Sequence, residues 1–253
     1  MTEQSVKVLK VVGIPNALLF PPPGCPGCQY PTVGRIVAEV LEELDVLNNS
    51  VAVMGVGCHA GMAMLNIDGM GFAHGRAPDT ATAVKRLIPE NLVFTFQGDG
   101  DCIAIGAGSF VGALGRGEKI TIIMINNANY GTTGGQTAPT TLLGQVTTTA
   151  GGGRDAEMAG YPIHVAELAA TFRGVAYSAR GAVNSPANYQ LTKRYIEKAF
   201  KKQLGRIGTS FVEVLSACPP NWHMSPVESL NWIEEHMIPE YPLEEFKDLE
   251  RIE

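Results

Sequence analysis

The sequence predicts an α/β fold in which helices cover both faces of a parallel sheet. Strand and helix signals alternate along most of the chain, which is typical of parallel sheets whose strands are joined by helices. The strand-like runs are short and rich in β-branched residues, and several end in loops of glycine and polar residues, as expected for buried strands that carry functional loops. No internal repeat is visible.

The predicted elements begin with a helix over residues 32–47, where apolar residues recur at three- and four-residue spacing. A last helix should begin at residues 225–228, because Ser-Pro-Val-Glu combines a capping serine, a proline in the first turn and a glutamate three positions on. Residues 131–155 are rich in Gly and Thr, and we interpret them as a functional loop rather than a flexible linker. The other predicted elements are strands over 50–54, 91–96, 119–125 and 209–216, and helices over 103–114 and 188–204.

The composition is that of one globular domain over residues 1–253, with a C-terminal helical extension. With 253 residues, 45% of them hydrophobic, the chain can bury a substantial core. A formal net charge of -6 argues against nucleic acid or an anionic membrane as a partner. Residues 1–10 lack the features of a secretory signal, and no run reaches the roughly 18 apolar residues of a membrane span. We therefore expect a cytoplasmic protein with reduced cysteines.

Two polar motifs follow neighbouring strands of the predicted sheet. Residues 98–101 read Gly-Asp-Gly-Asp and come after the strand over 91–96, and residues 126–127 are Asn-Asn after the strand over 119–125. One strand-helix-strand crossover separates the motifs, so both can lie at the carboxyl edge of the sheet, where open α/β folds bind ligands. Turn glycines and a capping asparagine are the structural alternative.

These motifs carry the ligand types that Mg²⁺ prefers. The Asp99 carboxylate, the Asn127 amide oxygen and a backbone carbonyl near Asn129 would supply three hard oxygen ligands, and a diphosphate would supply most of the others. Gly100 would let the backbone approach the phosphates, and the amides of Gly100 and Asp101 would donate hydrogen bonds to them. An alternative role for Asp101 is to cap the following helix.

Four of the five cysteines lie in predicted loops. Cys25 and Cys28 form Cys-Pro-Gly-Cys before the first predicted helix, a spacing that lets two thiolates bind one metal centre, although zinc and a redox dithiol remain alternatives. Cys58 and Cys218 each follow a predicted strand, so both can reach the edge that carries the Gly-Asp-Gly motif. Cys102 lies within the small-residue helix, where we expect a buried thiol.

Taken together, the motifs resemble the β subunit of the 2-oxoacid:ferredoxin oxidoreductases, which binds thiamine diphosphate in a transketolase-like diphosphate domain. The resemblance covers nearly the whole chain. It is carried by Cys-Pro-Gly-Cys at 25–28, Gly-Val-Gly-Cys at 55–58, His-Gly-Arg-Ala at 74–77, Gly-Asp-Gly-Asp at 98–101, Asn-Asn at 126–127, Tyr-Gly-Thr-Thr-Gly-Gly-Gln at 130–136, Ala-Pro-Thr at 138–140 and Glu-Val-Leu-Ser-Ala-Cys-Pro at 213–219.

The resemblance implies thiamine diphosphate with Mg²⁺, and a 4Fe-4S cluster held by Cys25, Cys28, Cys58 and Cys218. The implied reaction is the oxidative decarboxylation of a 2-oxoacid to acyl-CoA and CO2, with electrons passing from thiamine diphosphate through the cluster to ferredoxin. No glutamate within the cofactor motifs could activate the aminopyrimidine ring. The family implies that a pyrimidine-domain partner chain supplies it, beside γ-type and ferredoxin-like chains, so we expect the isolated chain to be an incomplete catalyst.

Individual site residues are also implied. The catalytic candidates are Thr132, His59 and Arg76. His59 could contact substrate or form hydrogen bonds only with the backbone, and Arg76 could bind a carboxylate or pair with a local acid. The residues implied to contact the cofactor are Val56, Gly57, Cys58, His59, Gly98, Gly100, Asp101 and Thr132.

The substrate is the least determined feature. Residues 160–163 and 225–239 resemble the 2-oxoisovalerate branch of the family more than the pyruvate branch. Residues 59–62 lack the lysine that 2-oxoglutarate-using relatives can carry there, and they also depart from the pattern of the branched-chain enzymes, so an apolar or unusually small 2-oxoacid side chain fits best. We expect a 2-oxoisovalerate-like acid, with 2-oxoglutarate, pyruvate or an unusual 2-oxoacid as alternatives. Two rival functions are a non-oxidative thiamine-diphosphate decarboxylase or synthase, and an electron-transfer or zinc-structured protein that uses only the cysteines.

Overall fold

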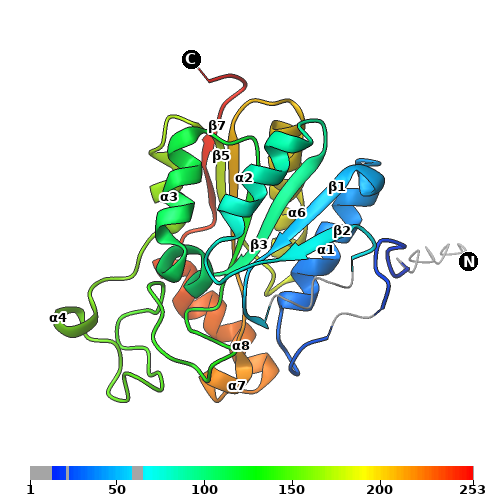
Figure 1. Cartoon of the computed structure of the whole chain (residues 1–253). Helices are drawn as coiled ribbons and strands as arrows, with labels where there is room; N and C mark the ends of the chain where they lie inside the picture. The colour runs from blue at the N-terminus through cyan, green and yellow to red at the C-terminus, as the bar shows by residue number, and fades with distance from the viewer. Residues whose placement is uncertain (1–12, 21–22, 59–64, 253) are drawn as a thin grey trace, which may run out of the picture.

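The computed structural model describes residues 13–20, 23–58 and 65–252 and contains a seven-stranded sheet in the order β2-β1-β3-β4-β6-β5-β7 (Figure 1). All neighbouring strands run parallel except β5 and β7, which are antiparallel. The strands are β1 Ser50–Met54, β2 Asp68–Gly71, β3 Leu92–Gly98, β4 Thr121–Asn126, β5 Val175–Ala182, β6 Thr209–Leu215 and β7 Glu244–Asp248.

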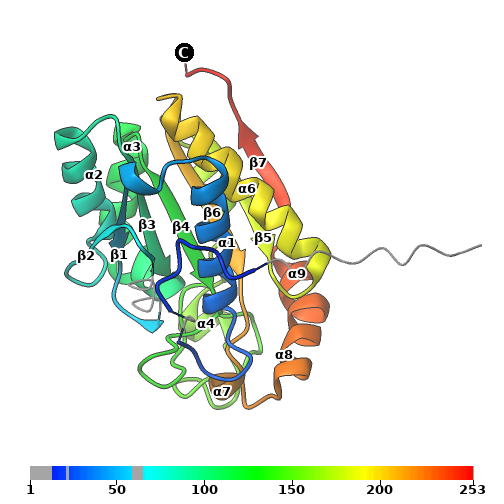
Figure 2. The ribbon, with the colours of Figure 1, turned by 90° about the vertical axis from the view of Figure 1, so that its right-hand side faces the viewer.

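Helices cover both faces of this sheet, as the sequence predicts. Helices α1 and α6 pack on one face, and α2, α3 and α5 pack on the other (Figures 1 and 2). The helices are α1 Tyr30–Glu43, α2 Ala77–Leu87, α3 Ala107–Arg116, α4 Ala156–Ala159, α5 Val165–Ala170, α6 Pro186–Leu204, α7 Pro219–Trp222, α8 Pro226–Trp232 and α9 Ile238–Glu240, with a 3-10 turn η1 Leu47–Asn49 and π turns η3 Gly100–Ile105 and η4 Ile233–Met237. No helix in the described part of the chain is long and apolar enough to cross a membrane.

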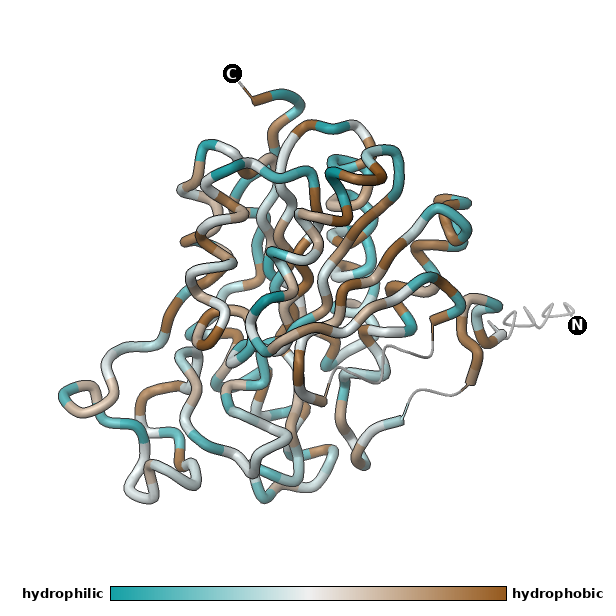
Figure 3. The backbone as a smooth tube through the Cα atoms, viewed as in Figure 1, coloured by the Kyte–Doolittle hydropathy of each residue, from teal (hydrophilic) through white to brown (hydrophobic). Residues whose placement is uncertain are grey.

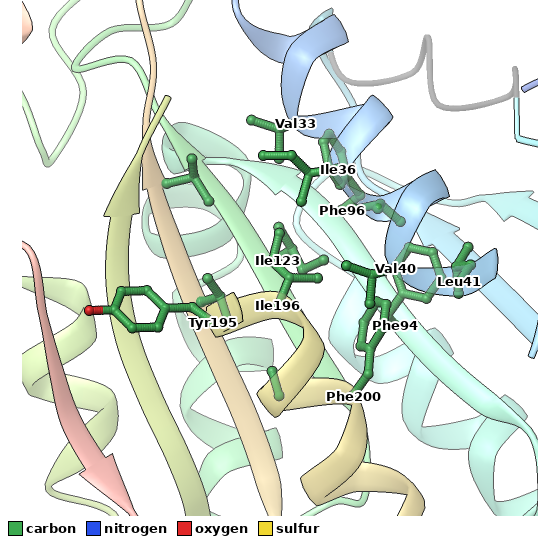
Figure 4. Close-up of a cluster of buried hydrophobic side chains, with 14 of the residues drawn as sticks. Val33, Ile36, Val40, Leu41, Phe94, Phe96, Ile123, Tyr195, Ile196 and Phe200 are labelled. Carbon is green, nitrogen blue, oxygen red and sulfur yellow. The ribbon is translucent and has the colours of Figure 1, made fainter. Parts of the chain in front are cut away.

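The core beneath α1 and α6 holds the central strands in place. Val33 and Ile36 of α1 and Phe200 of α6 are fully buried with Phe94 and Phe96 of β3 (Figure 4). The Phe94 and Phe200 rings lie 5.3 Å apart between centroids. Truncating a buried aromatic residue here to alanine would cost about 3–5 kcal/mol. In Figure 3, hydrophobic stretches follow the central strands, whereas the loops at the lower end are mostly neutral or hydrophilic.

The predicted elements are present, with shifted ends. The helix predicted over 32–47 ends at Glu43, because Asp45 adopts a left-handed backbone conformation with φ of 54°. The helix predicted at residues 225–228 is α8, and it begins with the expected capping box: the Ser225 side chain accepts from the Glu228 backbone, and the Glu228 side chain accepts from the Ser225 backbone.

The helix predicted over residues 103–114 differs more from the prediction. Residues Gly100–Ile105 form a π turn, and the regular helix α3 begins only at Ala107. The change of pitch occurs at Gly106, where an added Cβ would lie 2.3 Å from the backbone oxygen of Asp101 and 2.9 Å from that of Gly75. This close packing brings the segment around Gly75 against the start of the helix.

Several elements were not predicted, among them α2, α5, β2 and β5. The C-terminal segment is helical through α8 and α9, but it then returns to the sheet as β7 instead of remaining a purely helical extension. The loops that follow β3, β4 and β6 gather at one edge of the sheet, at the lower end in Figure 1. That edge carries the candidate site.

Candidate functional site

A pocket at the carboxyl edge of the sheet brings together most of the predicted site residues. It is lined by Tyr30, Val56, Gly57, Cys58, His74, Gly98, Asp99, Gly100, Asp101, Asn127, Asn129, Tyr130, Gly131, Thr132 and Thr133. His59 lies outside the described residues. Arg76 is described but does not line the pocket. It is exposed, and its Nη1 donates to Ser109 Oγ at 2.8 Å.

Oxygen atoms converge at the predicted magnesium position. The Asn127 amide faces Asp99 Oδ1 at 3.3 Å and the backbone oxygen of Asn129 at 2.8 Å. With its nitrogen toward these atoms the amide donates two hydrogen bonds, and with its oxygen toward them it adds a third oxygen beside the other two. Carboxylate, amide and backbone oxygens are hard ligands of the kind that Mg²⁺ prefers, so these residues fit part of the coordination of such an ion.

Asp99 is held in place by its neighbours. Its side chain is buried and accepts hydrogen bonds from the Gly100 amide at 2.8 Å and from the Thr140 hydroxyl. Burial raises the pKa of Asp99 to about 7, although the hydrogen bonds from Thr140 and Gly100 oppose that shift. A cation beside this carboxylate would favour its charged form.

Gly100 is required by packing as well as by its proposed approach to phosphates. A Cβ at this position would lie 2.2 Å from the Tyr130 ring. No side chain larger than hydrogen fits while Tyr130 keeps its place. Tyr130 itself lines the pocket beside Gly131 and Thr132.

Asp101 connects three segments of the pocket through its side chain. Oδ1 accepts from the Val56 amide at 3.1 Å and the Gly75 amide at 2.8 Å, and lies 2.5 Å from His74 Nδ1. Oδ2 accepts from Gln97 Nε2 at 2.5 Å. The sequence predicts that the Asp101 amide donates to a phosphate or that Asp101 caps the following helix. It does not predict these side-chain hydrogen bonds.

His74 is a pocket residue that the sequence analysis did not select. Its Nδ1 lies 2.5 Å from Asp101 Oδ1, and this contact orients the ring beside the pocket. The available signal was the position of His74 directly before Gly75 and Arg76 in a shared motif. Nothing in the spacing indicated that Asp101 would contact it.

The cysteines gather at the same end of the molecule. Cys25 and Cys28 form a tight turn, with the Cys28 amide donating to the Cys25 oxygen at 3.0 Å. Gly27 in this turn has φ of +79°, and an added Cβ would lie 3.0 Å from Pro219, the residue after Cys218. Burial, together with the nearby Cys218, Cys58 and Cys25, raises the pKa of Cys28 to about 11, although a backbone hydrogen bond at Tyr30 opposes that shift.

No three cysteine, histidine or acidic side chains of the described residues converge on a single ion position. In a 4Fe-4S cluster, the thiolates bind different irons, so the sulfurs surround a cluster and need not meet at one point. The turn at Cys25 and Cys28 and the Cys218 loop supply three soft ligands, and Cys58 borders the pocket. This donor set fits an iron-sulfur cluster chemically. Cys102 is fully buried in the core, as predicted.

Cys58 links the cysteine group to the pocket wall. Its Sγ lies 3.0 Å from Thr132 Oγ1. A Cβ added at Gly131 would lie 3.4 Å from Cys58 Sγ and 3.2 Å from Asn127 Nδ2. The predicted sulfur ligand and the predicted magnesium ligand therefore approach the same glycine from two sides.

The Gly- and Thr-rich segment is built around one arginine that the sequence did not indicate. Arg154 is buried, and its guanidinium donates to six backbone oxygens, those of Ala138, Pro139, Thr141, Ala159, Gly160 and Tyr161. The loop in turn places Thr140 against Asp99 and Thr141 Oγ1 against the Ala128 oxygen. The segment is thus tied to the site.

A buried ion pair contacts the Asn-Asn loop through Asn126. Arg180 of β5 and Glu213 of β6 are both fully buried, with Nε and Oε2 2.9 Å apart. Glu213 Oε1 accepts from Asn126 Nδ2 at 2.7 Å, and Asn126 Oδ1 accepts from the Ala128 amide at 3.0 Å. The ion pair therefore constrains the start of the loop that carries Asn127 and Asn129.

Comparison with known proteins supports the family. Residues 50–214 match the model of the thiamine pyrophosphate enzyme C-terminal TPP binding domain. The chain is 38% identical over 226 residues to ketoisovalerate oxidoreductase subunit VorA of Methanothermobacter marburgensis, covering 88% of this chain and 47% of VorA. It is 34% identical over 219 residues to 2-oxoglutarate synthase subunit KorB of Archaeoglobus fulgidus, covering 86% of this chain and 78% of KorB.

The chain belongs to the 2-oxoacid:ferredoxin oxidoreductase subunits. The predicted family and its thiamine-diphosphate-binding domain are confirmed. The chain spans about half the length of VorA. The fold is also similar to a chain of the 2-oxoglutarate:ferredoxin oxidoreductase from Magnetococcus marinus, solved with 2-oxoglutarate, coenzyme A and succinyl-CoA bound. The TM-score is 0.73, the identity is 23%, and the match covers 89% of this chain and 74% of that chain.

Proposed function

We propose that this chain is the thiamine-diphosphate-binding subunit of an enzyme that oxidatively decarboxylates a 2-oxoacid to acyl-CoA and CO2. The observation that carries the proposal is the convergence of Asp99, the Asn127 amide and the Asn129 backbone oxygen in a pocket that Cys58 also borders. Bound thiamine diphosphate supplies the electron sink that such a decarboxylation needs. Residues 1–253 would form a single domain for this purpose.

The residues of the pocket divide between the two ends of the proposed cofactor. Asp99, Asn127 and the Asn129 carbonyl would hold Mg²⁺, and the backbone at Gly98, Gly100 and Asp101 would bind the diphosphate. Val56, Gly57, Cys58, His59 and Thr132 would border the reacting end. Asp101 keeps the His74 ring and the Val56 loop in place, so its contribution is to position the pocket wall.

Cys25, Cys28, Cys58 and Cys218 would hold a 4Fe-4S cluster that passes electrons to ferredoxin. The tight turn at Cys25 and Cys28 packs against the loop of Cys218, which supports a shared group between them. Because Cys58 belongs to both the pocket and this set, the cluster would lie beside the cofactor. Electron transfer over such a short path needs no further carrier within this chain.

The proposed enzyme requires partner chains. Among the described residues that line the pocket, the carboxylates are Asp99 and Asp101, and both already serve other contacts. A pyrimidine-domain chain would therefore supply the activating glutamate, beside γ-type and ferredoxin-like subunits. The coenzyme A and succinyl-CoA bound to the similar structure support coenzyme A as the acyl acceptor.

We favour a 2-oxoisovalerate-like substrate because VorA, a ketoisovalerate oxidoreductase subunit, shares 38% identity with the chain. The similarity to KorB makes 2-oxoglutarate the alternative. Assays of the anaerobic complex with both acids, coenzyme A and ferredoxin distinguish them. Higher kcat/KM for 2-oxoglutarate would contradict the preferred substrate, and aldehyde formation without coenzyme A would indicate a non-oxidative enzyme instead.

The central test measures cofactor content. Purified with its natural partners without oxygen, the complex should contain one thiamine diphosphate and about four irons per copy of this chain, in addition to the iron of the ferredoxin-like subunit, which is measured separately on that subunit. Asp99→Ala should lose thiamine diphosphate and retain iron, whereas Asp68→Ala on the exposed strand β2 should keep both. Zinc in place of iron would disprove the cluster, and unchanged thiamine diphosphate in Asp99→Ala would disprove the metal assignment.

A further inference from the structure

A side-chain amide contacts the sulfur of one proposed cluster ligand. Asn221 lies in the short helix α7, three residues after Cys218, and its Nδ2 lies 3.3 Å from Cys218 Sγ. The same nitrogen donates to the Gly131 backbone oxygen at 2.8 Å. An amide nitrogen carries two hydrogens, so both bonds can form at once.

The surroundings hold this amide in place. Gly135 has φ of +81°, and a Cβ added there would lie 3.0 Å from Asn221 Cβ, so the asparagine packs directly on the Gly135 backbone. Helix α7 begins with Pro219 and Pro220, which restrict its backbone. The orientation of the Asn221 amide therefore does not depend on the charge of the Cys218 sulfur.

Cys218 is the most buried of the four proposed ligands, with 9% of its surface exposed, whereas Cys25 and Cys58 are exposed. Water reaches this sulfur least, so a protein dipole has more influence on it than on an exposed thiolate. Hydrogen bonds to cluster sulfurs are among the factors that set reduction potential, because they stabilise the more negatively charged, reduced state.

We infer that Asn221 is a positioning residue that raises the reduction potential of the cluster bound by Cys218. The inference rests on the proposed function. When the cluster accepts one electron from the cofactor, the added charge spreads onto its sulfurs, and the Asn221 N–H dipole stabilises it. The amide neither binds iron nor exchanges a proton. Its effect is on how easily the cluster is reduced.

Two variants change the donor while keeping the size of the side chain. Asn221→Leu removes both N–H groups, and Asn221→Asp replaces them with a negative charge beside the sulfur. Val227→Ala is the control, because Val227 lies in the next helix, α8, and is exposed. Each protein is purified without oxygen as the full complex and assayed for iron and sulfide.

The measurement is a redox titration of the cluster followed by electron paramagnetic resonance. In Asn221→Leu we expect the reduction equilibrium to fall about tenfold, which is about 59 mV toward lower potential for one electron. The potential of Asn221→Asp should fall further, and that of Val227→Ala should match the unaltered protein. If Asn221→Leu loses its iron, Asn221→Ser is titrated instead, and the same fall in reduction potential is expected.

An unchanged potential in an iron-loaded variant that lacks the amide would overturn the inference and leave the proposed function intact. Loss of iron in all the Asn221 variants would also overturn it, because Asn221 would then retain the cluster rather than tune it. If the unaltered protein contains no iron, both the inference and the cluster proposal fail.

Discussion

At the scale of single residues, Asp101 has the widest influence on the pocket. One buried carboxylate accepts from two backbone amides and from the side chains of His74 and Gln97. Asp99, two residues earlier, lies beside Asn127 in the same pocket, and its role as a magnesium ligand stays a prediction. The difference is that metal-ligating character follows from residue type, whereas the contacts of Asp101 depend on loops that reach it from distant parts of the sequence.

Replacing Asp101 with asparagine tests this arrangement. The amide would turn a donor toward other donors, and a buried hydrogen bond to a charged group is worth about 1.5–3 kcal/mol. We expect Asp101→Asn to weaken thiamine diphosphate binding about tenfold or more in the presence of Mg²⁺, measured by calorimetry on the anaerobic complex. Iron content should not change, and Asp68→Asn serves as the control. Undiminished affinity would show that the Asp101 contacts do not shape the pocket.

At the scale of elements, the loop between β4 and α5 is the clearest case of structure without periodicity. Residues 131–155 show no helical or strand pattern, yet the Arg154 guanidinium contacts three carbonyls within them and three more from residues 159–161. Arginine suits this position because its planar group carries five donors in a fixed geometry. The loop then places Thr140 on Asp99.

Arg154→Met should loosen this loop, because it leaves several buried carbonyls without a donor. We expect a loss of roughly 3 kcal/mol in the free energy of unfolding. Limited proteolysis should cut within residues 138–161, and denaturant titration should measure the loss. Arg154→Lys should recover only part of the lost free energy of unfolding, since an ammonium group has three donors. Equal proteolysis of Arg154→Met and of Arg194→Met, a change at an exposed position of α6, would contradict the prediction.

At the scale of the whole molecule, the ion pair of Arg180 and Glu213 joins β5, β6 and the Asn-Asn loop. Arg180 also contacts Glu167 of α5 and stacks against Tyr241 and Phe246, so the C-terminal segment closes over it. Breaking a buried pair leaves an uncompensated charge and is strongly destabilising. Strand β7 thus covers the buried arginine with Phe246 and also completes the sheet.

The acid stability of the molecule should depend on Glu167. Burial raises the pKa of Glu167, but the hydrogen bond and the charge of Arg180, a backbone hydrogen bond and the hydrogen bond from His164 together outweigh burial and hold that pKa below 4.5. The folded pKa lies below the unfolded value, so this stabilisation is present above about pH 4.5 and is lost as pH falls through the folded pKa. We expect Glu167→Gln to lower Tm at pH 7 by a few degrees and the difference to shrink toward pH 3.

Thermal unfolding of both proteins between pH 3 and pH 7 checks this dependence. Glu90→Gln, at an exposed position, is the control and should follow the unaltered protein throughout. A Tm difference between Glu167→Gln and the unaltered protein that stays constant across the range would contradict the assignment, because it would mean that no proton is taken up at Glu167.

The sequence by itself determined the fold class and several of the central strands and helices, and it predicts a metal and cofactor site at Asp99, Asn127 and the cysteines. These features are local: periodicity, caps and ligand types lie within a few neighbouring residues. Tertiary structure alone decided that His74 meets Asp101, that Arg154 organises a loop, and that Asn221 contacts both Cys218 and a carbonyl 90 residues away. Such contacts depend on where the sheet brings distant loops together, and no local pattern encodes that distance.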